Sequence, residues 1–171
     1  MTASDNDKLE RQANDAWERG RPSVAFRLYS ELANRGADAG MLNLGYFYDR
    51  GIGARKNRSL AMKWYLRAYR RGSGAAASNI ATIYRDEGRH RLQAQWYARA
   101  VRLQDGDAAV ELAKLVLEGK GIRNSRSHAS RLLRRASASQ CITEDGRDEA
   151  KAILHTLKGR PNKSLERTRD R

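Results

Sequence analysis

The feature that most constrains the fold of this chain is a sequence pattern that it contains twice. The segment LGYFYDRGIG, at residues 44–53, is followed 68 positions later by LAKLVLEGKG, at residues 112–121. Both segments begin with a leucine and end in Gly-x-Gly. The matched pairs are Leu44 with Leu112, Gly51 with Gly119, and Gly53 with Gly121. A pattern that recurs in this way indicates an internal repeat.

A second segment, AMKWYLRA at residues 61–68, sets the period of the repeat. Its small and aromatic residues recur, in part as leucine, 36 positions earlier, 32 positions later and 68 positions later. The matched sets are Ala61, Trp64, Tyr65 and Ala68; Ala25 and Tyr29; Trp96, Tyr97 and Ala100; and Ala129, Leu132, Leu133 and Ala136. Periods of about 20–50 residues are typical of solenoids. The sequence therefore predicts four stacked units, at about 7–36, 37–72, 73–104 and 105–138.

Each unit has the periodicity of two helices. Leu44, Gly45 and Tyr48 are spaced so that they share one face of a first helix, and Ala61, Tyr65 and Ala68 are spaced in the same way for a second helix. The small residues in both stripes allow two helices to approach closely. The sequence thus predicts a pair of packed helices in every unit.

The boundaries of these helices also have sequence signals. Gly51 and Gly53 allow positive φ, and such a glycine can end the first helix. Asn57 and Ser125 are candidates for the N-caps of second helices, and Pro22 suits the first turn of the corresponding helix in the first unit. These signals place the repeated Gly-x-Gly in the loop between the two helices.

These residues resemble a Sel-one-like repeat, of the tetratricopeptide-type family of α/α solenoids. The matching features are Leu44-Gly45, Tyr48, Gly51-x-Gly53, Ala61, Trp64-Tyr65, Ala68 and Gly72. The match is strong over 36–72, good over 105–138 and weaker over 73–104, where the loop is four residues shorter, while 7–36 resembles a plain tetratricopeptide unit. The resemblance implies an all-α fold, a right-handed α/α superhelical solenoid of helical hairpins with about nine helices.

The region after the fourth unit contains one more amphipathic pattern. Ala150, Ile153, Leu154 and Leu157 have helical spacing, which predicts a capping helix at about 144–158 that covers the end of the stack. We therefore expect a repeat solenoid over 1–158. The remaining segment, residues 159–171, is polar and basic, and we expect a flexible tail.

Charge and cysteine content limit the function classes. The net charge of +14 favours acidic partners, which include nucleic acid, an anionic membrane surface and acidic proteins. Cys141 is the only cysteine and cannot form an internal disulfide, which fits a reducing compartment. The sequence has no apolar run at its start and no window that approaches the about 18 apolar residues of a membrane span. We expect a cytoplasmic protein without a transmembrane segment.

Residues suited to catalysis or metal binding are scattered. His90, His128 and His155 lie in different parts of the repeat, and no Cys-x-x-Cys occurs. The Gly-x-Gly follows a helix rather than a strand and lacks the third glycine of a dinucleotide-binding loop, so a structural role is favoured. Three tryptophans recur at repeat positions, where core packing is expected: Trp17, Trp64 and Trp96. We expect no cofactor and no enzyme activity, and an enzyme whose site the sequence does not display remains the third alternative.

The resemblance implies that the first helix of each unit lines a concave face, which we call the groove. Residues beside the core stripes of these helices combine apolar centres with polar edges, as protein-binding patches do. The predicted groove residues are Leu42, Tyr46, Asp49, Ser78, Thr82, Arg85, Val110, Lys114 and Leu117, with Arg11, Asp15 and Glu18 in the first unit. Leu42 and Tyr46 are the expected anchors. The alternative is that some of these residues pack against neighbouring units.

The second helices carry most of the positive charge, and we call their outer surface the ridge. Residues 57–72, 89–104 and 123–138 contain arginine and lysine but no acidic residue. The predicted ridge residues are Arg58, Lys63, Arg67, Arg70, Arg71, Arg91, Arg99, Arg102, Arg126, Arg131, Arg134 and Arg135. Arginine favours fork-like contacts with carboxylate or phosphate.

The sequence therefore predicts a non-catalytic scaffold or adaptor that binds a protein or peptide partner in the groove, with a basic ridge for an acidic protein. Nucleic-acid binding by the ridge is the alternative, ranked lower because aromatic residues are not interleaved with the cations as base stacking requires.

Overall fold

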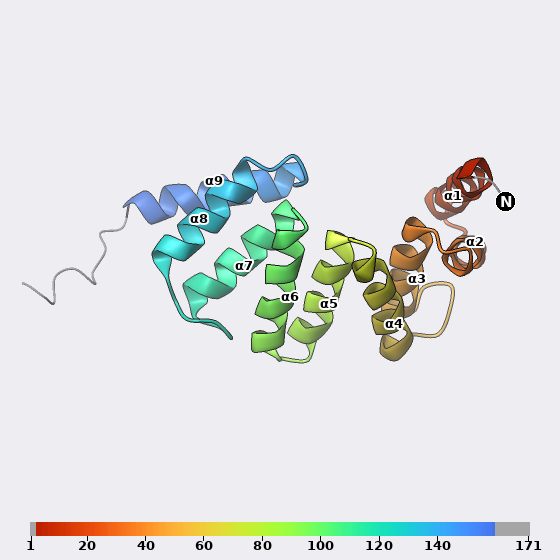
Figure 1. The fold of residues 1–171 in the computed structure, drawn as a ribbon, viewed down its shortest axis with the longest axis horizontal. Coiled ribbons are helices and arrows are strands. Elements are labelled where there is room, and N and C mark those ends of the chain that lie inside the picture. Colours follow the sequence, from red (N-terminus) through yellow and green to blue (C-terminus); the bar gives the residue numbers. More distant parts are fainter. Residues whose placement is uncertain (1–2, 160–171) are drawn as a thin grey trace, which may run out of the picture.

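The computed structural model describes residues 3–159, which fold into nine α-helices without a β-strand (Figure 1). The helices are α1 (Ala3–Glu18), α2 (Pro22–Asn34), α3 (Asp38–Arg50), α4 (Arg58–Arg70), α5 (Gly74–Asp86), α6 (His90–Arg102), α7 (Gly106–Glu118), α8 (Arg126–Ser137) and α9 (Glu144–Gly159). Each helix packs against the next one along the chain. The predicted fold class, an all-α solenoid, is confirmed.

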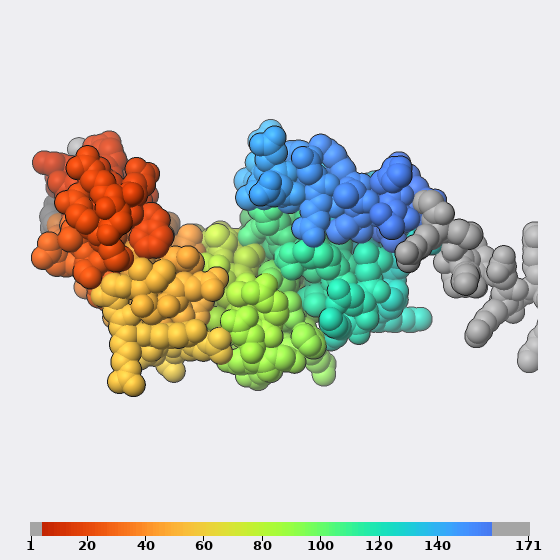
Figure 2. Space-filling view, turned by 180° about the vertical axis from the view of Figure 1, so that it is seen from behind, coloured from red at the N-terminus to blue at the C-terminus, as the bar shows by residue number. Residues whose placement is uncertain are grey.

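We number the units by their helix pairs: α1 with α2, α3 with α4, α5 with α6, and α7 with α8. Helix α9 packs on α8 and α7, where the sequence predicts the capping helix. Figures 1 and 2 show that α1 and α9 stand at the two ends of the row and rise on the same side of the middle helices. The predicted flexible tail lies outside the described residues, apart from its first residue, which ends α9.

The predicted pairing of small and aromatic residues explains how close the helices of one unit come. A Cβ atom at Gly45 of α3 would lie 2.6 Å from two ring carbons of Tyr65 of α4, so only glycine fits there. Tyr65, Ala61 and Ala68 are all completely buried. Three clusters of buried residues follow one another along the stack, and Phe26 contacts both clusters at the first boundary, so the core is continuous.

The predicted caps are confirmed. The side chain of Asn57 accepts a hydrogen bond from the backbone N–H of Leu60 at 3.0 Å, and that of Ser125 accepts one from His128 at 3.2 Å. Pro22 is the first residue of α2. Gly51 ends α3 in the left-handed conformation, with a φ of 72°, as the Gly-x-Gly pattern predicts.

The second glycine of each Gly-x-Gly has a different role, which is to let the loop touch the preceding unit. A Cβ atom at Gly53 would lie 2.7 Å from the carbonyl oxygen of Pro22, at the start of α2. A Cβ atom at Gly121 would overlap the backbone of His90 at the start of α6. The two loops therefore fold back and pack on the second helix of the unit before them.

Candidate binding surfaces

Contacts between alternate helices bear on which helices lie on the inner side of the stack. Helix α3 contacts α5, and α7 contacts α9, whereas no comparable contact joins two of the second helices within the described part. In a curved stack the elements on the inner side come closest together. The contact of α3 with α5 is what a stack with its first helices on the inner side would give, and the groove itself stays a prediction.

Most of the predicted groove residues remain accessible. Leu42, Tyr46, Thr82 and Leu117 are half-buried, and Arg85 is exposed. Leu42 and Leu117 also pack on the neighbouring core clusters, so each offers only part of its side chain to a partner.

The prediction is wrong for Val110, which is only 2% exposed and belongs to the core. Asp49 is also almost covered, at 8%. The physical reason is the same, since these first helices have neighbours on three sides: α7 packs against α6, α8 and α9, and α3 against α2, α4 and α5. More than one stripe of each of these helices is therefore buried.

Ser78 and Lys114 already have partners outside their own helices. Ser78 donates its hydroxyl hydrogen to Asp105 at 2.7 Å. Lys114 pairs with Glu111 on its own helix and with Glu149 of α9 at 2.9 Å. Burial lowers the pKa of Lys114, but the hydrogen bonds to the two glutamates outweigh it, and the pKa is raised overall. Both side chains thus support the packing of the first helices.

Three second helices each carry a buried tyrosine at an equivalent position, Tyr29, Tyr65 and Tyr97. Tyr29 of α2 donates its hydroxyl hydrogen to Asn14 of α1, and Thr82 of α5 acts on the pKa of the Tyr97 hydroxyl of α6. The equivalent hydroxyl of Tyr65 is buried and has no hydrogen-bond partner among residues 3–159. Burial raises the pKa of all three hydroxyl groups, and for Tyr65 the charge of Asp49 adds to this effect.

An aromatic pocket of about 250 Å³ opens where α1, α2 and α3 meet. Its lining residues, which define the name, are Trp17, Tyr29, Asn43, Tyr46 and Phe47. The Trp17 ring meets the Phe47 ring edge to face, with 5.4 Å between centroids, and the Tyr46 ring at 6.4 Å. Edge-to-face contacts between aromatic rings are favourable, so these contacts stabilise the positions of the rings that line the pocket.

The sequence predicted Tyr46 as an anchor of the groove, but it did not predict Trp17 as an accessible residue. Trp17 was expected in the core, yet it is 42% exposed. The prediction grouped Trp17 with Trp64 and Trp96, which lie on second helices, whereas Trp17 lies on a first helix, α1. Aligning the ends of α1 and α3, at Glu18 and Arg50, places Trp17 opposite Asp49, a predicted groove position.

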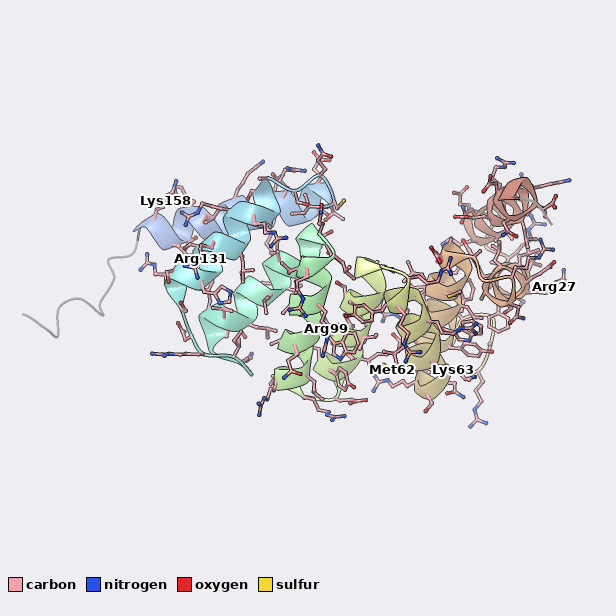
Figure 3. All side chains as sticks on the ribbon, viewed as in Figure 1. Arg27, Met62, Lys63, Arg99, Arg131 and Lys158 are labelled. Atoms are coloured by element: carbon pink, nitrogen blue, oxygen red, sulfur yellow. The ribbon has the colours of Figure 1, made fainter. Side chains whose placement is uncertain are left out.

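The ridge contains many cations without an acidic neighbour. Helices α4, α6 and α8 contain no Asp or Glu. Two ridge residues form ion pairs, Arg58 with Asp86 at 3.1 Å and Arg71 with Asp38. For the others no ion pair forms within the part of the chain that the structure describes. They are Lys63, Arg67, Arg70, Arg91, Arg99, Arg102, Arg126, Arg131, Arg134 and Arg135. Figure 3 shows labelled members of this surface, and Arg27 of α2, distributed along the length of the molecule.

Two ridge arginines are stacked on tryptophans. The guanidinium carbon of Arg67 lies 4.6 Å from the Trp64 ring centroid, and that of Arg99 lies 4.4 Å from the Trp96 ring centroid. The pairs occupy equivalent positions in α4 and α6. Stacking holds the planar guanidinium groups in place, and it covers ring surface that a nucleic-acid base would need.

Two further properties bear on function. Over residues 3–159, no group of three or more His, Cys, Asp and Glu side chains is placed to hold a metal ion. No helix in the same part of the chain is long and apolar enough to cross a membrane.

Comparisons with known proteins give one family. The model of the Sel1 repeat matches residues 38–73 and 106–140, which correspond to units 2 and 4. No curated protein matches the chain.

Two solved structures are similar to the fold. One is a Sel1 repeat protein from Oxalobacter formigenes, with a TM-score of 0.73, 23% sequence identity, and coverage of 87% of this chain and 59% of that one. The other is c5321, a protective antigen of uropathogenic Escherichia coli strains that displays an SLR fold, with a TM-score of 0.67, 22% identity, and coverage of 94% and 43%. The chain thus spans about half the length of these two proteins.

Proposed function

Since the chain is a Sel1-like repeat protein, we propose that it is a non-catalytic scaffold or adaptor that binds a segment of a partner protein in the groove. Repeats of this family generally serve as protein-interaction modules. The observation that carries the proposal is the accessible aromatic surface of the first helices, where Trp17 and Tyr46 flank the aromatic pocket. Exposed aromatic residues beside a pocket are typical anchors of protein interfaces.

The groove is tested by a double variant, Tyr46→Ala with Leu42→Ser, compared with the unaltered chain in capture from the native lysate. We expect the variant to lose the captured partner, identified by its mass, while its circular dichroism spectrum stays helical. Leu103→Ser is the matched control, because Leu103 is a large exposed hydrophobic residue, at 37%, in the turn after α6. Equal capture by the double variant and the unaltered chain would place the binding site elsewhere.

For the ridge we propose contact with an acidic protein. Its free cations along α4, α6 and α8 have no carboxylate partner, and on α4 they surround a shallow depression of about 490 Å³ whose lining includes Met62 and Leu66. A partner segment in which an apolar side chain lies between carboxylates would match these cations and the apolar lining of the depression. Covered tryptophan faces argue against base stacking, so nucleic acid remains the less favoured alternative.

Salt dependence and competition separate the two ridge partners. A nucleic acid that contacts about five phosphates would give a slope of log K against log salt of about −4.5, so a rise from about 50 to 200 mM would weaken binding on the order of 500-fold. We expect instead saturable one-to-one binding of a protein that duplex and single-stranded DNA do not displace.

The charge-reversal variant Arg67→Glu, Arg99→Glu and Arg134→Glu should abolish the protein contact. The control reverses three exposed cations of α1 and α9 that belong to neither the predicted groove nor the ridge: Lys8→Glu, Lys151→Glu and Lys158→Glu. Two results together would favour the nucleic-acid alternative. The unaltered chain would bind a random duplex at about 150 mM salt much more tightly than the roughly 10⁻⁴–10⁻⁶ M of non-specific contacts, and the triple reversal would remove this binding.

A further inference from the structure

We propose that the aromatic pocket binds the cationic group of a lysine or arginine side chain in the partner segment that occupies the groove, an inference that rests on the proposed function. The pocket is smaller than the roughly 300–1,000 Å³ of small-molecule sites, at about 250 Å³. It therefore has room for one side chain of a bound segment. Aromatic faces attract cations through their quadrupoles, which makes charge the property to examine.

Trp17 is the tryptophan whose surface is left open. Trp64 and Trp96 each have an arginine stacked on the ring, whereas no such contact covers Trp17 within the described residues. Tryptophan has the strongest cation–π attraction of the aromatic side chains. The chain thus uses this interaction twice on the ridge and leaves the third ring free beside the pocket.

The polar atoms of the pocket favour a donor as ligand. Asn43 donates from its side-chain nitrogen to the carbonyl oxygen of Ala39 at 3.0 Å, so its side-chain oxygen remains as an acceptor. Tyr29 donates its hydroxyl hydrogen to Asn14. Tyr29 thus uses its only hydroxyl donor, and Asn43 one of its two N–H groups, inside the protein, while the side-chain oxygens of both can still accept. An ammonium or guanidinium group supplies only donors, which matches this lining.

Acidic residues add to the attraction. Glu10, Asn14, Trp17 and Glu18 are spaced along one face of α1. Glu10 and Glu18 act electrostatically on the Tyr29 hydroxyl, and neither forms an ion pair among residues 3–159. Asp15, in contrast, is paired with Arg19 at 2.8 Å and Arg21 at 3.3 Å. Glu10 and Glu18 are thus two carboxylates without a paired cation that act on Tyr29, a residue of the pocket lining.

One cation of the protein already contacts the pocket wall. The guanidinium carbon of Arg50 lies 5.7 Å from the Tyr46 ring centroid, so this ring accepts a cation in the folded protein. Arg50 opposes a second cation by repulsion, whereas Glu10 and Glu18 favour one. The predicted ridge cations lie on α4, α6 and α8 and in the turn after α4, and none of them lines the pocket.

The test uses short peptides of the form acetyl-Gly-Ser-X-Ser-Gly-amide, with X as lysine, arginine, norleucine or glutamate. The readout is the indole N–H signal of Trp17 in ¹H–¹⁵N spectra, assigned through Trp17→Phe. About 150 mM salt limits the effect of the net charge of +14, since the screening length is then about 8 Å. We expect saturable shifts with lysine and arginine, at affinities at least about fivefold above norleucine. Equal affinity for norleucine, or no shift with any peptide, overturns the proposal.

Variants that remove negative charge distinguish the proposed cation-binding pocket from the proposed groove. The double variant Glu10→Gln with Glu18→Gln should weaken the lysine peptide by about threefold or more and leave norleucine unchanged, while Glu144→Gln on α9 should change neither. In lysate capture, loss with Tyr46→Ala and Leu42→Ser but full retention with the Glu10 and Glu18 variant would keep the groove and overturn the cation pocket. Retention with both variants would overturn the proposed groove.

Discussion

The joint between units 1 and 2 and the joint between units 2 and 3 are built differently. At the first joint the loop at residues 51–57 folds back onto α2, and Gly53 touches the backbone of Pro22. At the second joint the corresponding turn, at residues 87–89, is short, and apart from Gly88 and its two chain neighbours no atom of the described chain lies within 4 Å of where a Cβ would be at Gly88. The joint between units 3 and 4 resembles the first, because Gly121 meets the start of α6.

The second joint depends on side chains in place of a loop. Tyr69 of α4 and Trp96 of α6 meet edge to face at 5.1 Å, and Arg58 of α4 pairs with Asp86 of α5 at 3.1 Å. Beneath them Tyr65 shares a buried cluster with Ile80 and other residues of α5. The units that match the Sel1 repeat therefore attach themselves to the preceding unit through their loops, whereas unit 3 attaches to unit 2 through its helix surfaces.

The largest expected effect comes from removing the core of the side-chain joint. Tyr65→Ala should lower the free energy of unfolding by about 3–5 kcal/mol, because the ring is completely buried and leaves a cavity. Tyr65→Phe is the control: it removes only the hydroxyl group that has no partner in the described chain, and we expect stability to be unchanged or slightly higher. Chemical denaturation measures both. An unchanged midpoint for Tyr65→Ala would contradict the repeat assignment.

The loop joints are tested by adding one methyl group. Gly121→Ala and Gly88→Ala both place alanine at positive φ, of 68° and 69°, which costs about 1–2 kcal/mol. At Gly121 the methyl group also meets the backbone of His90, and we expect a further loss of about 1–3 kcal/mol. The two variants are compared by denaturation under identical conditions. Equal losses would mean that the loop does not brace the joint.

The sequence predicted the features that depend on neighbouring residues. Asn57 and Ser125 cap their helices, and Gly51 takes a left-handed conformation, because each of these roles is set by the local chain. The recurrence of residues equivalent to Ala61 and Tyr65 predicted the stacking, because these residues pack the two helices together in each unit.

Features that depend on distant segments were not predictable in the same way. The contact of Gly53 with α2 follows from the path of the loop in space, and the sequence indicates only that a glycine is there. Val110 was predicted at the surface because one helix stripe was assumed to be buried, while α7 has neighbours on three sides. Trp17 was predicted in the core because it was grouped with Trp64 and Trp96, although those two lie on second helices and Trp17 lies on a first helix.

A smaller effect is expected from the aromatic contact at the second joint. A double-mutant cycle with Tyr69→Leu and Trp96→Leu should give a coupling of about 0.5–1.5 kcal/mol, the usual range for edge-to-face pairs. Phe26 and Tyr48 form a similar contact across the first joint, at 5.4 Å and 89°, and serve as the matched cycle. Similar couplings would show that the two joints differ in their loops alone. A coupling near zero between Tyr69 and Trp96 would mean that the buried core, and not this aromatic contact, stabilises the second joint.

The smallest effect is expected from the ion pair across the second joint. Arg58 and Asp86 are each nearly 40% exposed, with values of 38% and 39%, so water and salt screen their attraction. The cycle of Arg58→Met and Asp86→Asn should give a coupling of about 0.2–1 kcal/mol that decreases as salt rises from about 0.05 to 1 M. Lys151 and Asp148, an exposed pair within α9, provide the control.

Because the Nε atom of Arg58 is buried without a partner within residues 3–159, the single variant Arg58→Met also removes an unsatisfied donor. This substitution should therefore destabilise the protein less than the removal of an arginine whose Nε atom is hydrogen-bonded. A coupling of about 2 kcal/mol that persists at high salt would make this ion pair, rather than helix packing, the main attachment of unit 3.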